Sequence, residues 1–333
     1  MLKRREFLKF SHPPAAPADG YWLHVSRIAM ACRFEVTLPR REKSGVFLAN
    51  RALEVADRVE RQLTVFKETS DISYINRTAA EHPVHLDASL WDLLILCRKL
   101  HFETGGSFDI TSAPMSRCWG FLRRQGRVPE PNEIRETLTI VGSERMRLDA
   151  EARTIRFERP GVELNFGSIG KGYALDRMAA AMRGGTDSAL LSAGSSSLLA
   201  IGSGDRWLGG WKVGIRHPLN RHRRLAVLRL RGCAMSTSGS EEQFFEHQGK
   251  RYGHIIDPRS GWPAEGVASA TVIAASAALT DALATAFYVG GVELAERFCV
   301  SNPGVMAIIL ESGAKLPVVL GANDQCKVET LSD

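Results

Sequence analysis

The stretch Asn165-Phe-Gly-Ser-Ile-Gly-Lys-Gly-Tyr-Ala-Leu-Asp176 contains the most distinctive pattern of the sequence, a glycine-rich turn that leads into a helix predicted over 171–183. Backbone N–H groups at a helix start can hold a phosphate, and Lys171 adds positive charge. The stretch is not a Walker A loop, because the long glycine spacing and the Ser or Thr after the lysine are missing. A tight strand-to-helix turn without a ligand explains the pattern equally well, and both interpretations stay open.

The segments on either side of this turn mix helices and strands. Residues 22–39 carry β-type side chains with some alternation and predict a first strand. Residues 46–66 place six apolar side chains at the spacing of a helix face. Another helix is predicted over 277–289, with a stop at Gly290-Gly291. Because the order shows no regular alternation of strand and helix, we predict an α+β fold.

The composition is that of an ordinary globular protein. Of the 333 residues, 44 % are hydrophobic and 24 % are charged, which excludes a disordered, collagen-like or fibrous chain. No run of about 18 apolar residues is present, so we expect no membrane-spanning segment. The net charge of +6 comes from 43 Lys and Arg against 37 Asp and Glu. Because the acidic residues are almost as numerous and are interspersed, we expect no nucleic-acid partner.

The six cysteines are isolated from one another along the chain. They form no CxxC pair and lack the spacing of a zinc site. We therefore expect reduced, mostly buried thiols, as is usual in a reducing compartment.

The first residues form a basic tail. Residues 1–9 resemble the start of a twin-arginine export signal, with Arg4 and Arg5 as the paired arginines. The apolar stretch that such a signal needs is missing, because prolines interrupt the residues that follow. We interpret residues 1–21 as a flexible basic tail or vestigial signal, followed by one domain over 22–333. This favours a cytoplasmic protein, and export to the periplasm through an atypical twin-arginine signal is the alternative.

Two polar residues share one face of the helix predicted over 277–289. Asp281 and Thr285 lie four residues apart, and their carboxylate and hydroxyl could together ligate Mg²⁺, which prefers oxygen ligands. An aspartate early in a helix also stabilises the helix N-terminus without any metal, and the pattern alone favours that interpretation. His254, at the end of a predicted strand, is either a base near such a site or a histidine packed at the strand end.

Short motifs follow one another along residues 25–321 in an order and spacing that would rarely arise by chance. They are Ala29-Met-Ala-Cys-Arg-Phe-Glu-Val36, Leu63-Thr-Val-Phe-Lys-Glu-Thr-Ser-Asp-Ile-Ser-Tyr-Ile-Asn76, Thr104-Gly-Gly-Ser-Phe-Asp-Ile-Thr111, Asn165 to Asp176, Ser192-Ala-Gly194, Ser236-Thr-Ser-Gly239, His254-Ile-Ile-Asp-Pro258 and Thr280-Asp-Ala-Leu-Ala-Thr-Ala286. Together they resemble the ApbE family of Mg²⁺-dependent FAD:protein FMN transferases. The resemblance implies a mixed α/β architecture in which an antiparallel sheet packs against helices.

The resemblance implies a reaction at the FAD pyrophosphate. A threonine or serine hydroxyl of an acceptor protein attacks the phosphorus on the FMN side, AMP leaves, and FMN stays attached through a phosphoester. The pyrophosphate is anionic and repels a nucleophile, so a metal must neutralise it and hold it in line. FAD, Mg²⁺ and an acceptor protein are therefore the expected partners, and membrane redox subunits are among the acceptors that family precedent suggests.

The family motifs assign a role to particular residues. By position, the metal ligands are the carbonyl of Gly170 and the side chains of Asp281 and Thr285, and His254 is the candidate general base. Asp281 and His254 are thus the expected catalytic residues. The expected FAD-binding residues are Phe66, Ser73, Phe108, Asp109, Thr111, Lys171, Tyr173, Ser238, Gly239 and His254, with apolar side chains on the isoalloxazine, polar groups at its edge and Tyr173 on the adenine.

The chain departs from the family pattern at several positions. The family usually has Asp at Asn165, Gly at Ser168 and Ala at Gly170, and it continues after Gly194 with glycine and a polar residue where this chain has serines. These departures keep two alternatives open: an Mg²⁺-dependent FAD pyrophosphatase, in which water replaces the protein hydroxyl, and a catalytically idle FAD-binding protein. The basic residues near Arg224 are either a solvated loop or a contact for an acidic acceptor surface.

Overall fold

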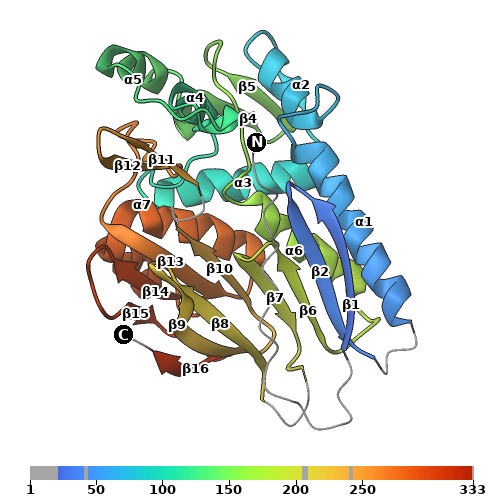
Figure 1. The fold of residues 1–333 in the computed structure, drawn as a ribbon. Coiled ribbons are helices and arrows are strands. Elements are labelled where there is room, and N and C mark those ends of the chain that lie inside the picture. The colour runs from blue at the N-terminus through green and yellow to red at the C-terminus, as the bar shows by residue number, and fades with distance from the viewer. Residues whose placement is uncertain (1–21, 41–43, 205–208, 240–242, 332–333) are drawn as a thin grey trace, which may run out of the picture.

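An antiparallel sheet of eight strands forms the centre of the fold in the computed structural model (Figure 1). The structure describes residues 22–40, 44–204, 209–239 and 243–331, and the tail predicted over 1–21 lies outside them. The strand order is β1-β2-β6-β7-β10-β13-β14-β15. The strands are β1 Trp22–Ala29, β2 Cys32–Pro39, β6 Ala189–Ala193, β7 Ser197–Ile201, β10 Ala234–Ser238, β13 Val267–Ala274, β14 Met306–Glu311 and β15 Val318–Gly321.

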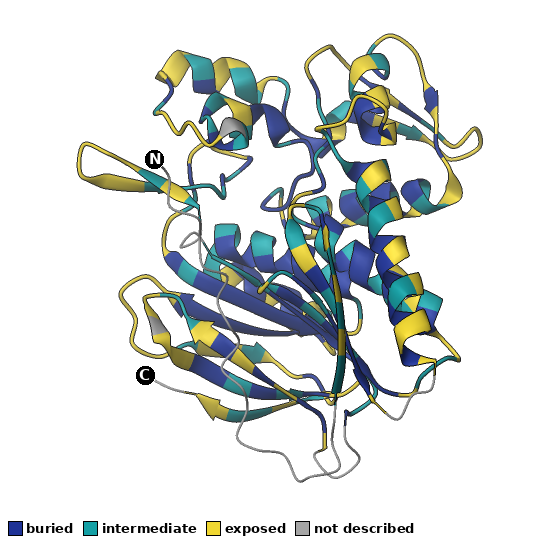
Figure 2. Ribbon diagram, turned by 45° about the vertical axis from the view of Figure 1, so that its right-hand side comes forward, coloured by how far each residue is buried: buried dark blue, intermediate teal, exposed yellow. Residues whose placement is uncertain are grey.

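Three long helices cover one face of this sheet. They are α1 (Gly45–Leu63), α6 (Gly170–Met182) and α7 (Ala277–Ser301), and α6 packs between the other two. Their apolar faces and the facing strand residues form the main core, in which Leu53, Leu175 and Phe287 are fully buried. Figure 2 shows most of the large sheet next to these helices coloured as buried. Because burial of one such side chain contributes about 1.5–3 kcal/mol, this layer fixes α6 and α7 firmly against each other.

A smaller antiparallel sheet covers the opposite face. Its order is β16-β9-β8, with β8 Trp211–His217, β9 Asn220–Leu230 and β16 Cys326–Leu331. A second core lies between the two sheets, with Trp211 and Leu228 from the small sheet against Ile273 and Ile308 from the large one. The fold is therefore α+β with antiparallel sheets and packed helices, as predicted.

The remaining elements lie above the ends of the helices and strands in Figure 1. None of the described helices combines the length and the apolar character needed to cross a membrane. The described cysteines are all free thiols.

The remaining elements are α2 Asp71–Thr78, β3 Val84–His85, α3 Ala88–Glu103, α4 Ala113–Cys118, the short η1 Phe121–Arg123, α5 Pro131–Leu138, the short η2 Ser143–Arg145, β4 Met146–Asp149, β5 Thr154–Phe157, β11 Phe244–His247 and β12 Lys250–Gly253.

Three boundaries differ from the sequence-based prediction. Residues 22–39 form the hairpin β1–β2 rather than one strand, because the two-residue turn at Met30-Ala31 carries no glycine, asparagine or aspartate that would reveal it. Helix α1 ends at Leu63, so Phe66 lies in the loop beyond it. Helix α7 does not stop at 290–291, since a single non-helical residue at Gly291 (φ 72°) kinks it and the chain then continues helical to Ser301.

Candidate functional site

The glycine-rich turn meets α7 at the first turn of α6. The backbone N–H of Gly172 donates to Asp281 Oδ2 at 3.0 Å, and Asp281 is only 5 % exposed. A Cβ atom on Gly172 would lie 2.0 Å from the carbonyl oxygen of Ala277, so glycine is required for the close approach of the two helices. This turn therefore directs an N–H group at a carboxylate of the chain, a favourable partner for the positive end of a helix.

The second oxygen of Asp281 has two further partners. Oδ1 accepts a hydrogen bond from Ser197 Oγ at 3.1 Å and lies 3.6 Å from Lys171 Nζ. Ser197 is completely buried at the start of β7, whereas Lys171 is partly exposed. Asp281 is thus a buried carboxylate. Its one charged neighbour in the described part of the chain is Lys171, which is also partly exposed to solvent.

Thr285 lies one helical turn beyond Asp281 and is held loosely. Its Oγ1 is 3.3 Å from Ser238 Oγ, at the end of β10, and 3.4 Å from the carbonyl oxygen of Asp281. Both distances are long for hydroxyl hydrogen bonds. The hydroxyl of Thr285 can therefore change partner at little energetic cost.

The tip of the β1–β2 hairpin closes over Gly170. A Cβ atom on Gly170 would lie 2.8 Å from Met30 Cε, so the methionine occupies the space beside this glycine. Cys32 follows in the same hairpin, and burial raises the pKa of its thiol to about 11, with Asp281 and Glu60 adding to the effect and Lys171 opposing it. The thiol therefore stays protonated at neutral pH and contributes no charge to the site.

These groups suit Mg²⁺. Asp281 supplies a buried carboxylate, Thr285 supplies a weakly bonded hydroxyl on the same helix face, and Gly170 supplies a backbone carbonyl at the start of α6. All three are hard oxygen donors of the kind that Mg²⁺ prefers, and no sulfur or nitrogen ligand is required. The chemistry of the donor set therefore fits the metal that the family resemblance implies.

Asn165 preserves the shape of the turn despite its departure from the family pattern. Its Oδ1 accepts the N–H of Gly167 at 2.8 Å, and the N–H of Gly170 donates to the carbonyl oxygen of Phe166 at 2.7 Å. An asparagine oxygen accepts such a bond as an aspartate oxygen does. The amide therefore removes a charge near the site and keeps the backbone of the turn.

A model of the ApbE family matches residues 30–310. The chain belongs to the ApbE family. The FAD:protein FMN transferase of Treponema pallidum is 29 % identical over 315 residues, which cover 90 % of this chain and 87 % of the relative. Curated relatives of the ApbE family establish the chain as a transferase.

Solved structures of the ApbE family share the whole fold. The ApbE protein of Thermotoga maritima aligns with a TM-score of 0.81 and 26 % identity, covering 91 % of this chain and 97 % of that one. The apo form of the flavinyl transferase ApbE of Pseudomonas stutzeri aligns with a TM-score of 0.76 and 26 % identity, covering 92 % and 96 %.

Phe66 is the most exposed of the FAD-binding residues expected in this ApbE-family chain. Its side chain is 78 % exposed in the loop after α1. Two hydrogen bonds fix this loop, since Ser70 Oγ and Ser73 Oγ both donate to the carbonyl oxygen of Thr64. Ser73 is buried, so its role in the described structure is to hold the loop that presents Phe66.

Phe108, Asp109 and Thr111 are enclosed by the fold. Phe108 belongs to the main core and is 1 % exposed. Thr111 donates to Asp109 Oδ1 from both its backbone N–H (2.7 Å) and its hydroxyl (2.6 Å). Their expected contact with FAD stays a prediction, and the structure gives these side chains partners inside the protein.

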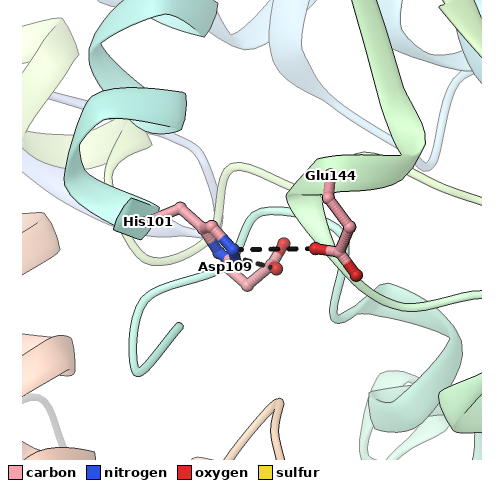
Figure 3. Close-up of side chains that lie close together, drawn as sticks. All are labelled: His101, Asp109 and Glu144. Carbon is pink, nitrogen blue, oxygen red and sulfur yellow. Dashed lines mark ion pairs between the residues drawn. The ribbon is translucent and has the colours of Figure 1, made fainter. Parts of the chain in front are cut away.

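A second cluster of metal-ligating residue types surrounds Asp109 (Figure 3). His101 Nδ1 lies 3.0 Å from Asp109 Oδ2, and His101 Nε2 lies 3.7 Å from Glu144 Oε2. The Asp109 carboxylate also accepts bonds from Ser143 N (2.9 Å) and Ser143 Oγ (3.0 Å), in addition to those from Thr111. Because five donor groups already surround this carboxylate, the cluster is better described as an ion-paired network than as a metal site.

His254 lies in a different environment from Asp281. Its Nδ1 is 3.1 Å from the carbonyl oxygen of Gln243, and its ring packs edge-on against Phe121. The described contacts of His254 thus belong to the aromatic region around β11 and β12, and none of them reaches Asp281. Its expected role as a base stays a prediction.

Tyr173 and Gly239 complete the expected set. The hydroxyl of Tyr173 is 3.5 Å from the carbonyl oxygen of Ser89, and the Arg177 guanidinium lies 6.0 Å from its ring centre. Tyr173 lines a groove of about 660 Å³ between α1 and α6. Gly239 directly follows β10, next to Ser238.

The sequence analysis missed three residues of the site region. Ser197 contacts Asp281 directly, Met30 covers Gly170, and His101 pairs with Asp109. The serines after Gly194 were visible as a departure from the family pattern, which was the available signal for Ser197. His101 carried no signal, because its partner becomes apparent only when the chain after α3 folds back.

Proposed function

We propose that this ApbE-family chain is a Mg²⁺-dependent FAD:protein FMN transferase that attaches FMN to a threonine or serine of an acceptor protein through a phosphoester. The observation that carries the proposal is the Asp281–Thr285 pair on one face of α7, beside Lys171 and the first turn of α6. The names of the relatives from Treponema pallidum and Pseudomonas stutzeri support it.

Three groups of this chain would hold the metal: the carbonyl of Gly170, the carboxylate of Asp281 and the hydroxyl of Thr285. Bound Mg²⁺ supplies positive charge that neutralises the pyrophosphate and orients it for displacement. Lys171 places a further positive charge beside Asp281, at 3.6 Å from its Oδ1, and this charge favours an anionic substrate at the same position. The buried hydroxyl of Ser197 and the backbone N–H of Gly172 both donate to the aspartate and keep it oriented.

The transfer breaks the phosphoanhydride bond of FAD and forms a phosphoester bond to the acceptor. The acceptor hydroxyl oxygen forms a bond to the phosphorus on the FMN side, while the bond from that phosphorus to the oxygen of AMP breaks. AMP leaves with the bridging oxygen and the electron pair of the broken bond. The hydroxyl proton passes to a base, for which His254 is the candidate.

The hydrogen bond of His254 defines its tautomer. A carbonyl oxygen only accepts, so the 3.1 Å contact between Nδ1 and the Gln243 carbonyl requires the proton of a neutral ring on Nδ1. Nε2 is then the unprotonated nitrogen of the neutral ring, the one that can accept the hydroxyl proton. Phe66, exposed in its loop, offers an aromatic face for the isoalloxazine ring.

The test is incubation of the purified protein with FAD, Mg²⁺ and an extract of the source cells, followed by mass spectrometry of flavin-bearing peptides. A peptide carrying FMN on threonine or serine, with AMP released, is the expected result. Cleavage of FAD to FMN and AMP without a labelled peptide would assign a pyrophosphatase instead. FAD that is bound and stays intact in Mg²⁺ would assign an idle binding protein.

A further inference from the structure

His101 connects the last turn of α3 to a buried carboxylate (Figure 3). Its Nδ1 lies 3.0 Å from Asp109 Oδ2, and the Asp109 side chain is only 1 % exposed. On the other side of the ring, Glu144 is 3.7 Å from Nε2 and its side chain is 56 % exposed. His101 is the only cationic side chain within ion-pair distance of Asp109 in the described part of the chain.

Asp109 in turn joins two further segments. Its carboxylate accepts both the N–H and the hydroxyl of Thr111, and both the N–H and the hydroxyl of Ser143 at the start of η2. The hydroxyl of Thr111 also accepts the N–H of Gly142 at 2.7 Å. Because every one of these groups is buried, loss of the cation at His101 would leave the carboxylate charge without its only ionic partner.

The same segment holds the glycine-rich turn. The carbonyl oxygen of Ile110, between Asp109 and Thr111, accepts the N–H of Asn165 at 2.7 Å. Asn165 then fixes Gly167 through its side chain, and the turn ends at Gly170, the first residue of α6. Hydrogen bonds and short stretches of covalent backbone thus alternate from His101 to the turn that carries the carbonyl of Gly170.

We infer that His101 is a positioning residue for the glycine-rich turn: its contact with Asp109 fixes Ile110, and Ile110 fixes the turn that carries Gly170 and Lys171. This inference rests on the proposed function, because it assigns His101 an effect on the metal requirement of that reaction. The described polar contacts of His101 are with Asp109, Glu144 and the carbonyl oxygen of Phe108, and none of them is with an expected metal ligand.

The other charged groups around His101 do not replace it. On α3, Lys99 pairs with Glu103. Arg259 lies next to Gly106, and two nitrogens of its guanidinium donate to the Asp257 carboxylate at 2.8 Å. On η2, Arg145 Nε donates to the carbonyl oxygen of Val141. Each of these cations already has a partner of its own, so a variant that lacks the imidazole leaves Asp109 without a substitute cation.

Hydrogen–deuterium exchange of peptides covering 163–170 tests the inference without any turnover. His101→Leu removes both the charge and the hydrogen bond, His101→Gln keeps a hydrogen-bond donor, and Glu144→Gln is the matched control on the exposed side of the ring. We expect the amides of 165–170 to exchange about tenfold faster or more in His101→Leu, less so in His101→Gln, and as in the wild type in Glu144→Gln.

The Mg²⁺ concentration that gives half-maximal FMN transfer provides the functional measurement. We expect it to rise several-fold in His101→Leu, while the rate at saturating Mg²⁺ changes less, since the carbonyl of Gly170 is displaced and no reacting group is removed. Unchanged exchange over 163–170, or faster exchange spread evenly over the whole chain, would overturn the inference. If the wild type transfers no FMN, the proposed function fails, while the exchange experiment still decides the role of His101.

Discussion

The backbone N–H of Gly172 donates a 3.0 Å hydrogen bond to Asp281 Oδ2, and this contact joins the first turn of α6 to α7. The two residues are 109 positions apart, yet the missing side chain of one allows the buried carboxylate of the other to approach. The glycine-rich stretch thus serves helix packing and orientation of the carboxylate at the same time. The sequence alone was interpreted either as a phosphate-binding turn or as a turn without a ligand. Neither interpretation includes the contact with Asp281.

Gly172→Ala is expected to separate the two helices. The new Cβ would lie 2.0 Å from the carbonyl oxygen of Ala277. This oxygen belongs to the backbone, which cannot move aside as the end of a flexible side chain can. Overpacking of this kind costs about 1–3 kcal/mol or more. Gly170→Ala is the matched control, because its Cβ meets only the flexible end of Met30, and we expect its stability within about 1 kcal/mol of wild type. Urea unfolding of both variants measures the difference, and equal midpoints would refute the packing argument.

Phe66→Ala is expected to weaken FAD binding without loss of stability. The ring is 78 % exposed, so little apolar burial is lost when it is removed. If it stacks on the flavin, the apparent KM for FAD rises by about tenfold, which corresponds to the worth of one aromatic pair. Phe47→Ala is the control, since Phe47 is similarly exposed at the opposite end of α1. A KM for FAD that changes equally in both variants would exclude Phe66 from the flavin site.

The His101–Asp109 pair predicts a pH-dependent difference between wild type and His101→Leu. Burial alone lowers the pKa of His101, but the hydrogen bond and charge of Asp109, together with Glu144, raise it above 6.5. Burial raises the pKa of Asp109, and the contacts with His101 and Thr111 outweigh it and lower that pKa below 3.8. The histidine contribution is complete below pH 6.5 and fades as pH rises through the raised pKa. The aspartate contribution is complete above pH 3.8 and fades as pH falls through the lowered pKa.

The largest stability difference between the two proteins is therefore expected from about pH 4 to pH 6.5. Urea unfolding at pH 5, 7 and 9 measures it, and the difference should shrink toward pH 9. A difference that stays constant over this range would show that the imidazole contributes by packing and not by charge.

Cys32 is expected to react slowly with alkylating reagents although it lies in the site region. With a thiol pKa raised to about 11, only about one thiolate in a thousand is present at pH 8. Iodoacetamide labelling followed by peptide mass spectrometry gives the rate for this cysteine, and a cysteine-containing model peptide is the reference. Labelling of Cys32 at the rate of the model peptide would contradict the burial described for the hairpin tip.

The sequence predicted the parts of the site that lie on one element. The four-residue spacing of Asp281 and Thr285 placed them on one helix face, because helical geometry is local. The α+β class was predicted from the order of the helices and strands, which are themselves recognised from local patterns of residues. The hairpin turn at Met30-Ala31 escaped detection, because neither residue is typical of positive φ values.

Contacts between distant segments could not be predicted from spacing. Ser197 reaches Asp281 from a strand 84 positions earlier, and His101 reaches Asp109 only because the chain folds back after α3. Phe108 was expected at the flavin from the family resemblance; its side chain lies in the core, and its contact with FAD stays a prediction. Composition and periodicity do not distinguish a buried aromatic residue that packs from one that binds a ligand.

The most direct test of the central claim is the Mg²⁺ dependence of FMN transfer to the labelled acceptor, measured for the wild type and for Asp281→Asn. Ser197→Ala is the matched control, since it removes a hydrogen bond to Asp281 and leaves every expected metal ligand in place. The account predicts Mg²⁺-dependent attachment of FMN with release of AMP by the wild type and by Ser197→Ala, and a loss of at least about a hundredfold in Asp281→Asn. Transfer by Asp281→Asn at the wild-type rate and with the same Mg²⁺ dependence would contradict it.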